Sequence, residues 1–484
     1  MPGFFCLRDR TGFVKLAPFL SCTLIYRYRM SRRPDLLNAP IRPTLVRMTV
    51  PMMFGIVSLM LFNLADIWFV SRLGTEPMAA LAFTFPVSFS VVSLAIGLGV
   101  GTSATLARLI GSGSGATAAR LATDNLLLTI VLMAAVGAGG QFLIDPLFGL
   151  MGAAPELMPL IHAYMQIWFA GSVFLVLNMV CNSTFRASGE TRLSASIMLL
   201  SSLLNMVLDP LLIFGWGPVP ALGIQGAATA SVLAWSITTL LALHLLYHRK
   251  GMLVLALPQW RSMLGHWRQL LSISLPAALS NMMTPLANGV LTALVAVHGA
   301  EAVAAFGAGA RIESLSLLVC LALSMTLPPF ISQNFGAGQL KRVQLAYRGA
   351  VRFAVVWQLL IFVLLVLLSG PVSGLFSDDP EVARWLQLWM LIVPAGFGFQ
   401  AVTFLSASSF NALHQPMRAM RISLFRLFLM YVPLGWLGNT LFGLNGMFVA
   451  LVLANAMTAL VARLWVRRYL RALDATVTAA AHQP

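Results

Sequence analysis

Long, predominantly apolar runs constrain this chain more than any other feature of its sequence. Residues 353–369 and 420–441 are examples, and such runs approach or exceed the roughly 20 residues that a helix needs to cross a bilayer. Hydrophobic residues make up 59% of the 484-residue chain and charged residues only 10%, a balance that no soluble domain carries. Lipid offers the backbone no hydrogen-bond partner, and the runs lack the alternation of barrel strands. We therefore predict an all-α polytopic membrane protein.

Apolar runs separated by Gly, Pro and charged residues predict twelve membrane helices, and short connections make consecutive helices antiparallel. The expected ranges are 46–71, 79–107, 122–144, 159–184, 193–215, 223–247, 271–297, 303–330, 350–369, 384–409, 420–440 and 443–465. The predicted domains are an N-terminal tail (1–40), a six-helix N-lobe (41–247), a linker (248–270), a six-helix C-lobe (271–466) and a C-terminal tail (467–484). Residues 1–29 match nothing else in the chain, and Met30 offers an alternative start.

The basic residues indicate the orientation in the membrane. Arginine and lysine gather in loops after even-numbered helices and in the tail, whereas loops after odd-numbered helices carry Arg72 and seven of the 15 acids. Because cytoplasmic loops keep an excess of arginine and lysine, we expect both termini to be cytoplasmic, in a bacterial cytoplasmic (inner) membrane. The net charge of +16 is spread over these short loops rather than clustered in one patch, so no nucleic-acid partner is expected.

An internal repeat organises the chain at an offset of 225 residues, the distance from Pro51 to Pro276. Near the end of the repeat the register slips by five, where the sequence from Gly223 to Gly226 answers that from Gly443 to Gly446. Each repeat holds six predicted helices, so the two lobes enter the membrane in the same direction. Parallel repeats are a transporter architecture with the substrate site near mid-membrane between the lobes. Further pairs are Gly74 with Gly299, Glu76 with Glu301, Gly111 with Gly336, Gly113 with Gly338, and Phe185 with Phe410.

Three acids lie well inside predicted helices: Asp66, Asp209 and Glu313. An ionisable residue in a membrane span is costly and usually belongs to an ion or substrate pathway. Asp66 and Asp209 each lie about five residues before the outer end of their helix, so they share one depth. Asn63 precedes Asp66 by three residues and Asn205 precedes Asp209 by four, so each amide shares a helix face with its carboxylate.

Thr229 in the sixth predicted helix reaches the same depth as the two acids. Together with Asp66, Asn205 and Asp209 it offers either an oxygen-rich cage for Na⁺ or a site for one shared proton. The repeat partners of Asp66, Asn205 and Asp209 are Leu291, Met430 and Leu434, so only the N-lobe carries this charge set. Acids that only stabilised the fold would be expected in both lobes. Their presence in one lobe alone indicates an ion site in the N-lobe.

Two further residues allow a structural and a functional interpretation. Glu313 lies two residues from Arg311 and therefore off its face, so a partner for it must come from another helix; it is either structural or a secondary polar contact for substrate. Pro51 lies in the first third of its helix, where a proline frees a carbonyl and kinks the helix, and it is a candidate conformational hinge.

Catalytic motifs do not emerge from the sequence. We find no Walker loop, no GxSxG and no HExxH, and no loop is long enough to house such a site, so we do not expect an enzyme. Cys6, Cys22, Cys181 and Cys320 lack CxxC spacing, which supports neither a metal centre nor a disulfide framework.

Several motifs together resemble the multidrug and toxic compound extrusion (MATE) family over about residues 40–470. They are the first predicted helix with Pro51 and Asp66, the glycine run from Gly97 to Gly101, the segment Ile110-Gly111-Ser112-Gly113, the segment Phe185 to Gly189, the pair Asn205 and Asp209, and the segment Gln333 to Gly338. The resemblance implies two six-helix lobes and export of small organic cations driven by inward H⁺ or Na⁺. It also implies coupling roles for Asp66, Asn205, Asp209, Thr229 and, as a looser match, Asn178.

The resemblance carries further expectations. Another branch of the family has acids in helices 7 and 10, but 271–297 and 384–409 hold none, which favours the branch coupled through the N-lobe. We expect a monomer surrounded by lipid, with no cofactor besides the coupling ion. The alternative function is a flippase or exporter of a lipid-linked or other amphipathic metabolite.

Overall fold

The computed structural model describes residues 35–218, 220–254 and 259–481. The elements of this part are all helices, so the protein is an all-α membrane protein as predicted. Eleven of these helices are long and apolar enough to cross a membrane, and the last of them is divided by a kink into two crossings. Residues 1–34 of the predicted N-terminal tail, with the alternative start at Met30, lie outside the described residues.

The N-lobe consists of six membrane helices that correspond to the first six predicted ones. They are α2 (Ile41–Ser71), α3 (Thr75–Gly111), α4 (Gly115–Leu150), α5 (Met158–Ala187), α6 (Thr191–Ile213) and α7 (Ile224–His244), the last continued by the π-helix η1 (Leu245–Arg249). The first four helices are longer than expected because turns of three to seven residues join α2 to α6, whereas the longer segment 214–223 separates α6 from α7. Asp124, for example, was expected near a helix start, but it lies in the third turn of α4.

The C-lobe repeats this plan with more interruptions. Its elements are α8 (Trp260–Ala296), α9 (Ala300–Ser316), α10 (Leu318–Gly336), α11 (Leu340–Phe376), α12 (Pro380–Ile392), the 3₁₀-helix η2 (Val393–Gly396), α13 (Phe397–Ala412), α14 (Pro416–Leu424), the π-helix η3 (Phe425–Tyr431) and α15 (Val432–Ala481). The backbone leaves helical geometry at Phe442 and Gly443, which turns α15 back across the membrane. This kink separates the eleventh and twelfth predicted helices.

Backbone geometry supports the internal repeat. Gly74 and Gly299 precede equivalent helices with φ of 114° and 103°, and Gly223 and Gly443 have φ of 57° and 62°. These values lie in the region that side chains with a Cβ avoid, so both members of each pair must be glycine. The offset of 225, and of 220 after the slip, therefore corresponds to a repeated chain path and not only to repeated letters.

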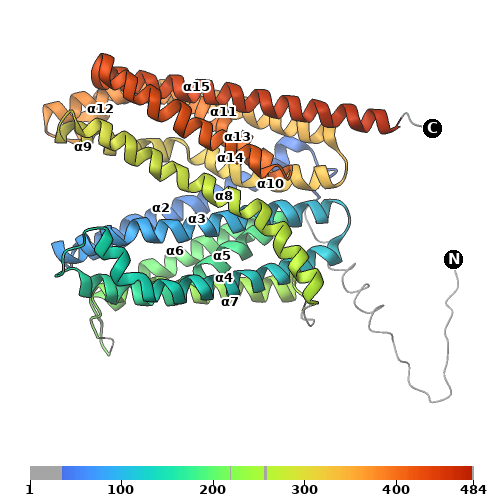
Figure 1. Ribbon diagram of the computed structural model, residues 1–484, viewed down its shortest axis with the longest axis horizontal. Coiled ribbons are helices and arrows are strands. Elements are labelled where there is room, and N and C mark those ends of the chain that lie inside the picture. Colours follow the sequence, from blue (N-terminus) through green and yellow to red (C-terminus); the bar gives the residue numbers. More distant parts are fainter. Residues whose placement is uncertain (1–34, 219, 255–258, 482–484) are drawn as a thin grey trace.

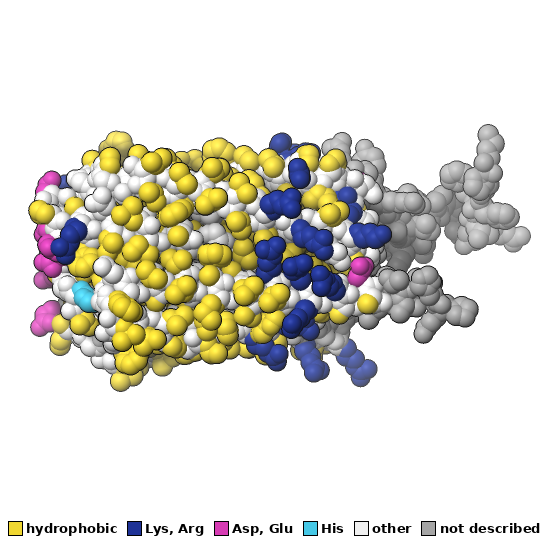
Figure 2. Space-filling model, turned by 90° about the horizontal axis from the view of Figure 1, so that it is seen from above, with side chains coloured by type: hydrophobic (Ala, Val, Ile, Leu, Met, Phe, Trp, Pro, Cys, Tyr) yellow, Lys and Arg dark blue, Asp and Glu magenta, His cyan; other side chains and the backbone are white. Residues whose placement is uncertain are grey.

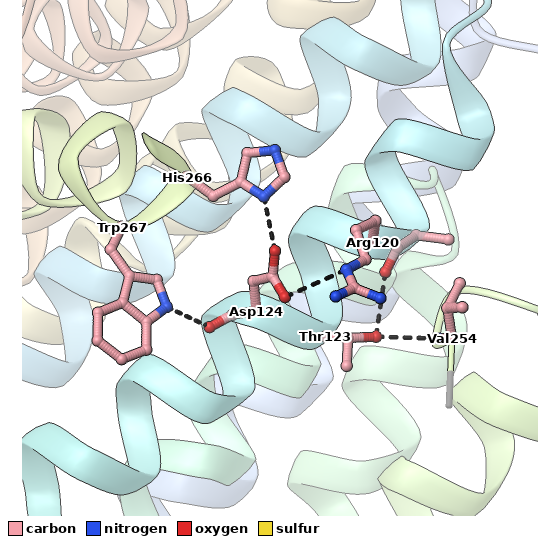
Figure 3. Close-up of polar contacts among 7 residues, drawn as sticks. Arg120, Thr123, Asp124, Val254, His266 and Trp267 are labelled. Carbon is pink, nitrogen blue, oxygen red and sulfur yellow. Dashed lines mark hydrogen bonds and ion pairs between the residues drawn. The ribbon is translucent and has the colours of Figure 1, made fainter. Parts of the chain in front are cut away.

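The first turns of α8 contact the N-lobe. We expected a linker up to residue 270, but α8 already begins at Trp260, and its first turns lie against α4. There His266 donates from Nδ1 to Asp124 at 2.7 Å and Trp267 donates to the Asp124 carbonyl at 2.8 Å, while Arg120 forms an ion pair with the same carboxylate at 3.5 Å (Figure 3). Asp124 is 1% exposed, so these partners compensate a buried charge.

Charged side chains divide the molecule into two ends. Lysine and arginine gather at the end that carries the C-terminus, which we call the basic end, and most visible acids lie at the opposite, acidic end (Figure 2). The surface between the two ends is largely hydrophobic on the face shown, as expected for a belt that contacts lipid.

The two lobes approach each other at the basic end and spread apart toward α9 and α12 at the acidic end (Figure 1). Thr49 of α2 and Thr326 of α10 share a hydrogen bond of 2.9 Å, and Gln333 donates to the Ala187 carbonyl at 2.7 Å. His414, in the loop after α13, contacts the Ala104 carbonyl at 3.3 Å. Burial lowers the pKa of His414 to about 4, so the ring is neutral near pH 7 and donates from Nε2.

Candidate functional site

Asp66 lies in the acidic half of α2, five residues before the helix ends at Ser71. Its side chain is half-buried, and its Oδ1 atom is fully buried without a hydrogen-bond partner in the described part of the chain. An unpaired carboxylate oxygen in an apolar environment costs several kcal/mol unless it is neutralised or bound. The residue therefore needs something from outside the chain to complete it.

Asp209 of α6 is completely buried and lies close enough to Asp66 for the two charges to interact. Asn205 lies one turn before it, and the Asn205 amide contacts the Ser231 hydroxyl of α7 at 3.1 Å. When the amide oxygen accepts from Ser231, the amide nitrogen donates to Asp209 at 2.8 Å. This orientation satisfies every partner, so we assign it. α6 and α7 are thereby linked beside the carboxylate.

Tyr164 of α5 completes the surroundings of the acid pair. Its ring is buried, and both Asp66 and Asp209 interact electrostatically with its hydroxyl group. Neither Tyr164 nor Ser231 was selected from the sequence, because an isolated tyrosine or serine in an apolar helix is unremarkable there. Four helices, α2, α5, α6 and α7, thus contribute to one polar centre in the N-lobe.

Two of the predicted site residues are oriented differently from this centre. The Thr229 hydroxyl donates to the Gln225 carbonyl of its own helix at 2.8 Å. Thr229 is two residues from Ser231 and so lies on nearly the opposite face of α7, away from Asn205. Asn63 is exposed on α2. Its spacing places it near Asp66 along the helix, but it is not enclosed with the acid pair.

Asn178 belongs to a second polar contact, deeper between α5 and α7. It donates to the Thr238 hydroxyl at 2.9 Å and accepts from Asn182 at 2.8 Å. Thr238 is seven residues, or about 10 Å, along α7 from Ser231. The structure therefore places Asn178 about two turns away from the acid pair. A coupling role for Asn178 remains a prediction.

Pro51 lies inside α2, half-buried and two residues from the interlobe contact of Thr49. A bend at Pro51 would move the acidic half of α2, with Asp66, relative to this contact. The hinge is still a prediction, but its position joins the acid pair to the interface between the lobes.

A second charged cluster occupies the C-lobe, around Glu313. The Glu313 carboxylate accepts from Gln400 of α13 at 2.8 Å, so its partner does come from another helix. It also interacts electrostatically with Arg426 of η3. Arg426 donates to the Tyr431 hydroxyl, which in turn donates to Asn455 of α15 at 2.7 Å. Arg426 lies inside the predicted helix 420–440, and we missed it because only acids were followed into the spans.

The chain is similar to known proteins over most of its length. It matches the MatE family model twice, over residues 51–211 and 276–437, which reproduces the internal repeat. It is 43% identical over 447 residues to a FAD transporter of Shewanella oneidensis, covering 92% of this chain and 99% of that protein. It is 24% identical to the probable multidrug resistance protein NorM of Thermotoga maritima, covering 73% of this chain and 76% of that protein. The structure of the MATE transporter VcmN of Vibrio cholerae in its bent form aligns with a TM-score of 0.85 at 32% identity, covering 89% and 97%.

Proposed function

The chain belongs to the MatE family of multidrug and toxic compound extrusion transporters, and from this premise we propose that it is an ion-coupled exporter of an organic substrate. Its relatives are transporters, so it is not an enzyme. The observation that carries the proposal is the Asp66–Asp209 pair, in which one buried carboxylate oxygen has no partner among the residues that the structure describes.

The coupling ion that fits this pair is a proton. A hard cation prefers several oxygen ligands, but here the Asn205 amide turns its nitrogen, not its oxygen, toward Asp209, and Thr229 lies on nearly the opposite face of α7 from Ser231. Two carboxylates in a low-dielectric site instead readily share one proton. Binding of Na⁺ by Asp66, Asn205, Asp209 and Thr229 would require these side chains to rearrange.

The ion drives transport through alternating access. A proton entering at the acidic end neutralises the pair, and neutralisation favours the state in which the acidic half of α2 has moved. An ion shifts a conformational equilibrium only if it binds one state more tightly than the other. Asp66 must therefore be protonated in the state that buries it and charged in the state that exposes it. Pro51 lies where α2 would bend between them.

The basic end is proposed to be cytoplasmic, in a bacterial cytoplasmic membrane, with the protein acting as a monomer. The reason is the excess of lysine and arginine at this end. A reporter that is active only outside the cytoplasm should work when fused after Asp378, between α11 and α12, and should fail when fused after Gly338, before α11. Equal activity at both fusion points would contradict this orientation.

Two substrate classes are candidates. Small organic cations follow from the acids of the N-lobe and from relatives named as multidrug export proteins at 23–25% identity. The second class is FAD, the substrate in the name of the relative that is 43% identical over nearly its whole length. It corresponds to the amphipathic metabolite that the sequence left as an alternative. We propose FAD as the principal substrate because this similarity extends over both lobes.

Transport into everted membrane vesicles tests both the ion and the substrate. Vesicles from a host without its own efflux pumps should accumulate FAD when their lumen is acidic, and should release it when the proton gradient is collapsed. A sodium gradient should not replace the proton gradient. Uptake of ethidium in place of FAD would identify organic cations as the substrate class. Uptake of neither compound would contradict the proposed export function.

A further inference from the structure

The C-lobe cluster is placed where a transported molecule would meet it. Arg426 lies ten residues after the start of α14 at Pro416, about 15 Å along the axis and hence near mid-membrane. By the repeat offset it is equivalent to Ser201, one turn from Asn205 in the N-lobe site. The Tyr431–Asn455 bond links η3 to α15, as the Asn205–Ser231 contact links α6 to α7. The two lobes thus hold polar centres at comparable positions, with acids in one and a guanidinium in the other.

Arg426 is not held in a closed ion pair. A guanidinium and a carboxylate that only stabilise each other adopt direct, often bidentate, contacts. Glu313 is instead bonded to Gln400, and within the described residues it forms no direct ion pair with Arg426. The Nε atom of Arg426 is buried without a partner. A planar donor group with an unused N–H, in the middle of a membrane helix, is a costly arrangement that a ligand can relieve.

The surroundings of Arg426 are aromatic. Its guanidinium carbon lies 4.5 Å from the ring centroid of Tyr431 and 5.5 Å from that of Phe404. Such stacking holds the guanidinium plane in place while leaving its edge available. Tyr431 is buried and Phe404 is half-buried, so the accessible apolar surface beside the guanidinium belongs to Phe404.

The local backbone produces this arrangement. η3 is π-helical over Phe425–Tyr431, and a π-turn joins residues i and i+5, which is the spacing of Arg426 and Tyr431. Val432 donates to the Leu427 carbonyl with the same spacing. π-turns within α-helices are uncommon and often mark functional sites.

We propose that Arg426, stacked on Tyr431 and Phe404, binds the anionic group of the exported substrate, and that Glu313 tunes this site by its negative charge. The substrate class is an aromatic organic anion that carries a phosphate, as FAD does. This inference rests on the proposed export function but assigns the binding of the anion to the C-lobe, separate from the ion pair of the N-lobe. Glu313 competes electrostatically with the ligand for Arg426.

Binding measured on the purified protein without any ion gradient tests the site apart from coupling. We expect Arg426→Gln to weaken FAD binding about 10- to 100-fold, the value of a charge-assisted hydrogen bond, and Arg426→Lys to weaken it less. Binding of riboflavin, which lacks the phosphates, should change little in either variant. Glu313→Gln keeps an acceptor for Gln400 and removes the charge, so it should strengthen FAD binding.

The controls separate this inference from the export function. In Asp66→Asn, which loses ion-driven transport, adding Arg426→Gln should still weaken FAD binding about 10- to 100-fold; that loss leaves the site standing even where export fails. Unchanged FAD affinity in folded Arg426→Gln, or a weaker affinity in Glu313→Gln, would overturn the site. A third result would also overturn the site: the wild-type protein binds no FAD, but phosphatidylglycerol protects Arg426 from modification by phenylglyoxal. The Arg426 guanidinium would then bind a lipid phosphate.

Discussion

Asp66→Asn should abolish ion-driven export while the protein remains folded and inserted. Asparagine keeps the shape of the side chain but cannot change charge, so the site stays permanently in the state that resembles the protonated acid. Coupling free energies between two ligands are typically about 1–3 kcal/mol, and we therefore expect the ratio of energised to non-energised transport to fall by about 5- to 150-fold. The measurement is substrate uptake into everted vesicles with and without an acidic lumen.

Two further variants make this result specific to the acid pair. Asp209→Asn should reduce coupling as well, but it also replaces one of the two carboxylate oxygens that accept from Asn205 by an NH2 donor, so its loss includes a packing defect. Asp378→Asn changes an exposed acid at the acidic end and should behave as wild type. The pH dependence of transport should flatten in Asp66→Asn, because the titrating group is gone. A variant that keeps the wild-type pH profile and full coupling would exclude Asp66 from the ion pathway.

The sequence predicts the acid pair because a carboxylate inside an apolar run is conspicuous by itself. The residues that surround the acid pair could not be predicted in this way. Ser231 and Tyr164 are ordinary residues of a helix interior, and only the packing of α5, α6 and α7 shows that they surround the pair. Thr229 was selected from its depth, but depth does not fix the helical phase, and two residues change the face by nearly half a turn.

The C-lobe shows a second limit of the sequence. Arg426 is as conspicuous in its run as Asp66, yet no spacing rule connects it to Glu313, which lies more than a hundred residues earlier. The π-helical turn that brings Arg426 to Tyr431 also has no signature in the residue pattern, since it depends on tertiary packing of η3 against its neighbours. By contrast, the repeat and the helix order could be predicted, because both depend on local hydrophobicity and on similarity at a constant offset.

Helices α3 and α10 cross at the basic end, and the residues in contact there are partners in the internal repeat. A Cβ added to Gly111 would lie 2.0 Å from the Gln333 carbonyl oxygen, and one added to Gly336 would lie 2.2 Å from the Arg108 carbonyl oxygen. Gly111 and Gly336 are repeat partners, and so are Arg108 and Gln333. The lobes thus close at the basic end through two equivalent contacts of glycine with backbone, which have no flexible side chain to yield.

Gly111→Ala and Gly336→Ala should therefore each open the basic end. Overpacking of this kind typically costs about 1–3 kcal/mol, which would shift the balance between the two ends about 5- to 150-fold toward the form open at the basic end. Spin labels on exposed Arg192 and Lys341, one in each lobe, report the change as a longer distance, and transport should fall in parallel. Gly349→Ala is the matched control, because its Cβ would meet no atom within 4 Å. A closed basic end cannot accommodate either methyl group without a shift of the helices. If both alanine variants nevertheless keep the wild-type label distance and transport rate, these glycines do not determine the closure of the basic end.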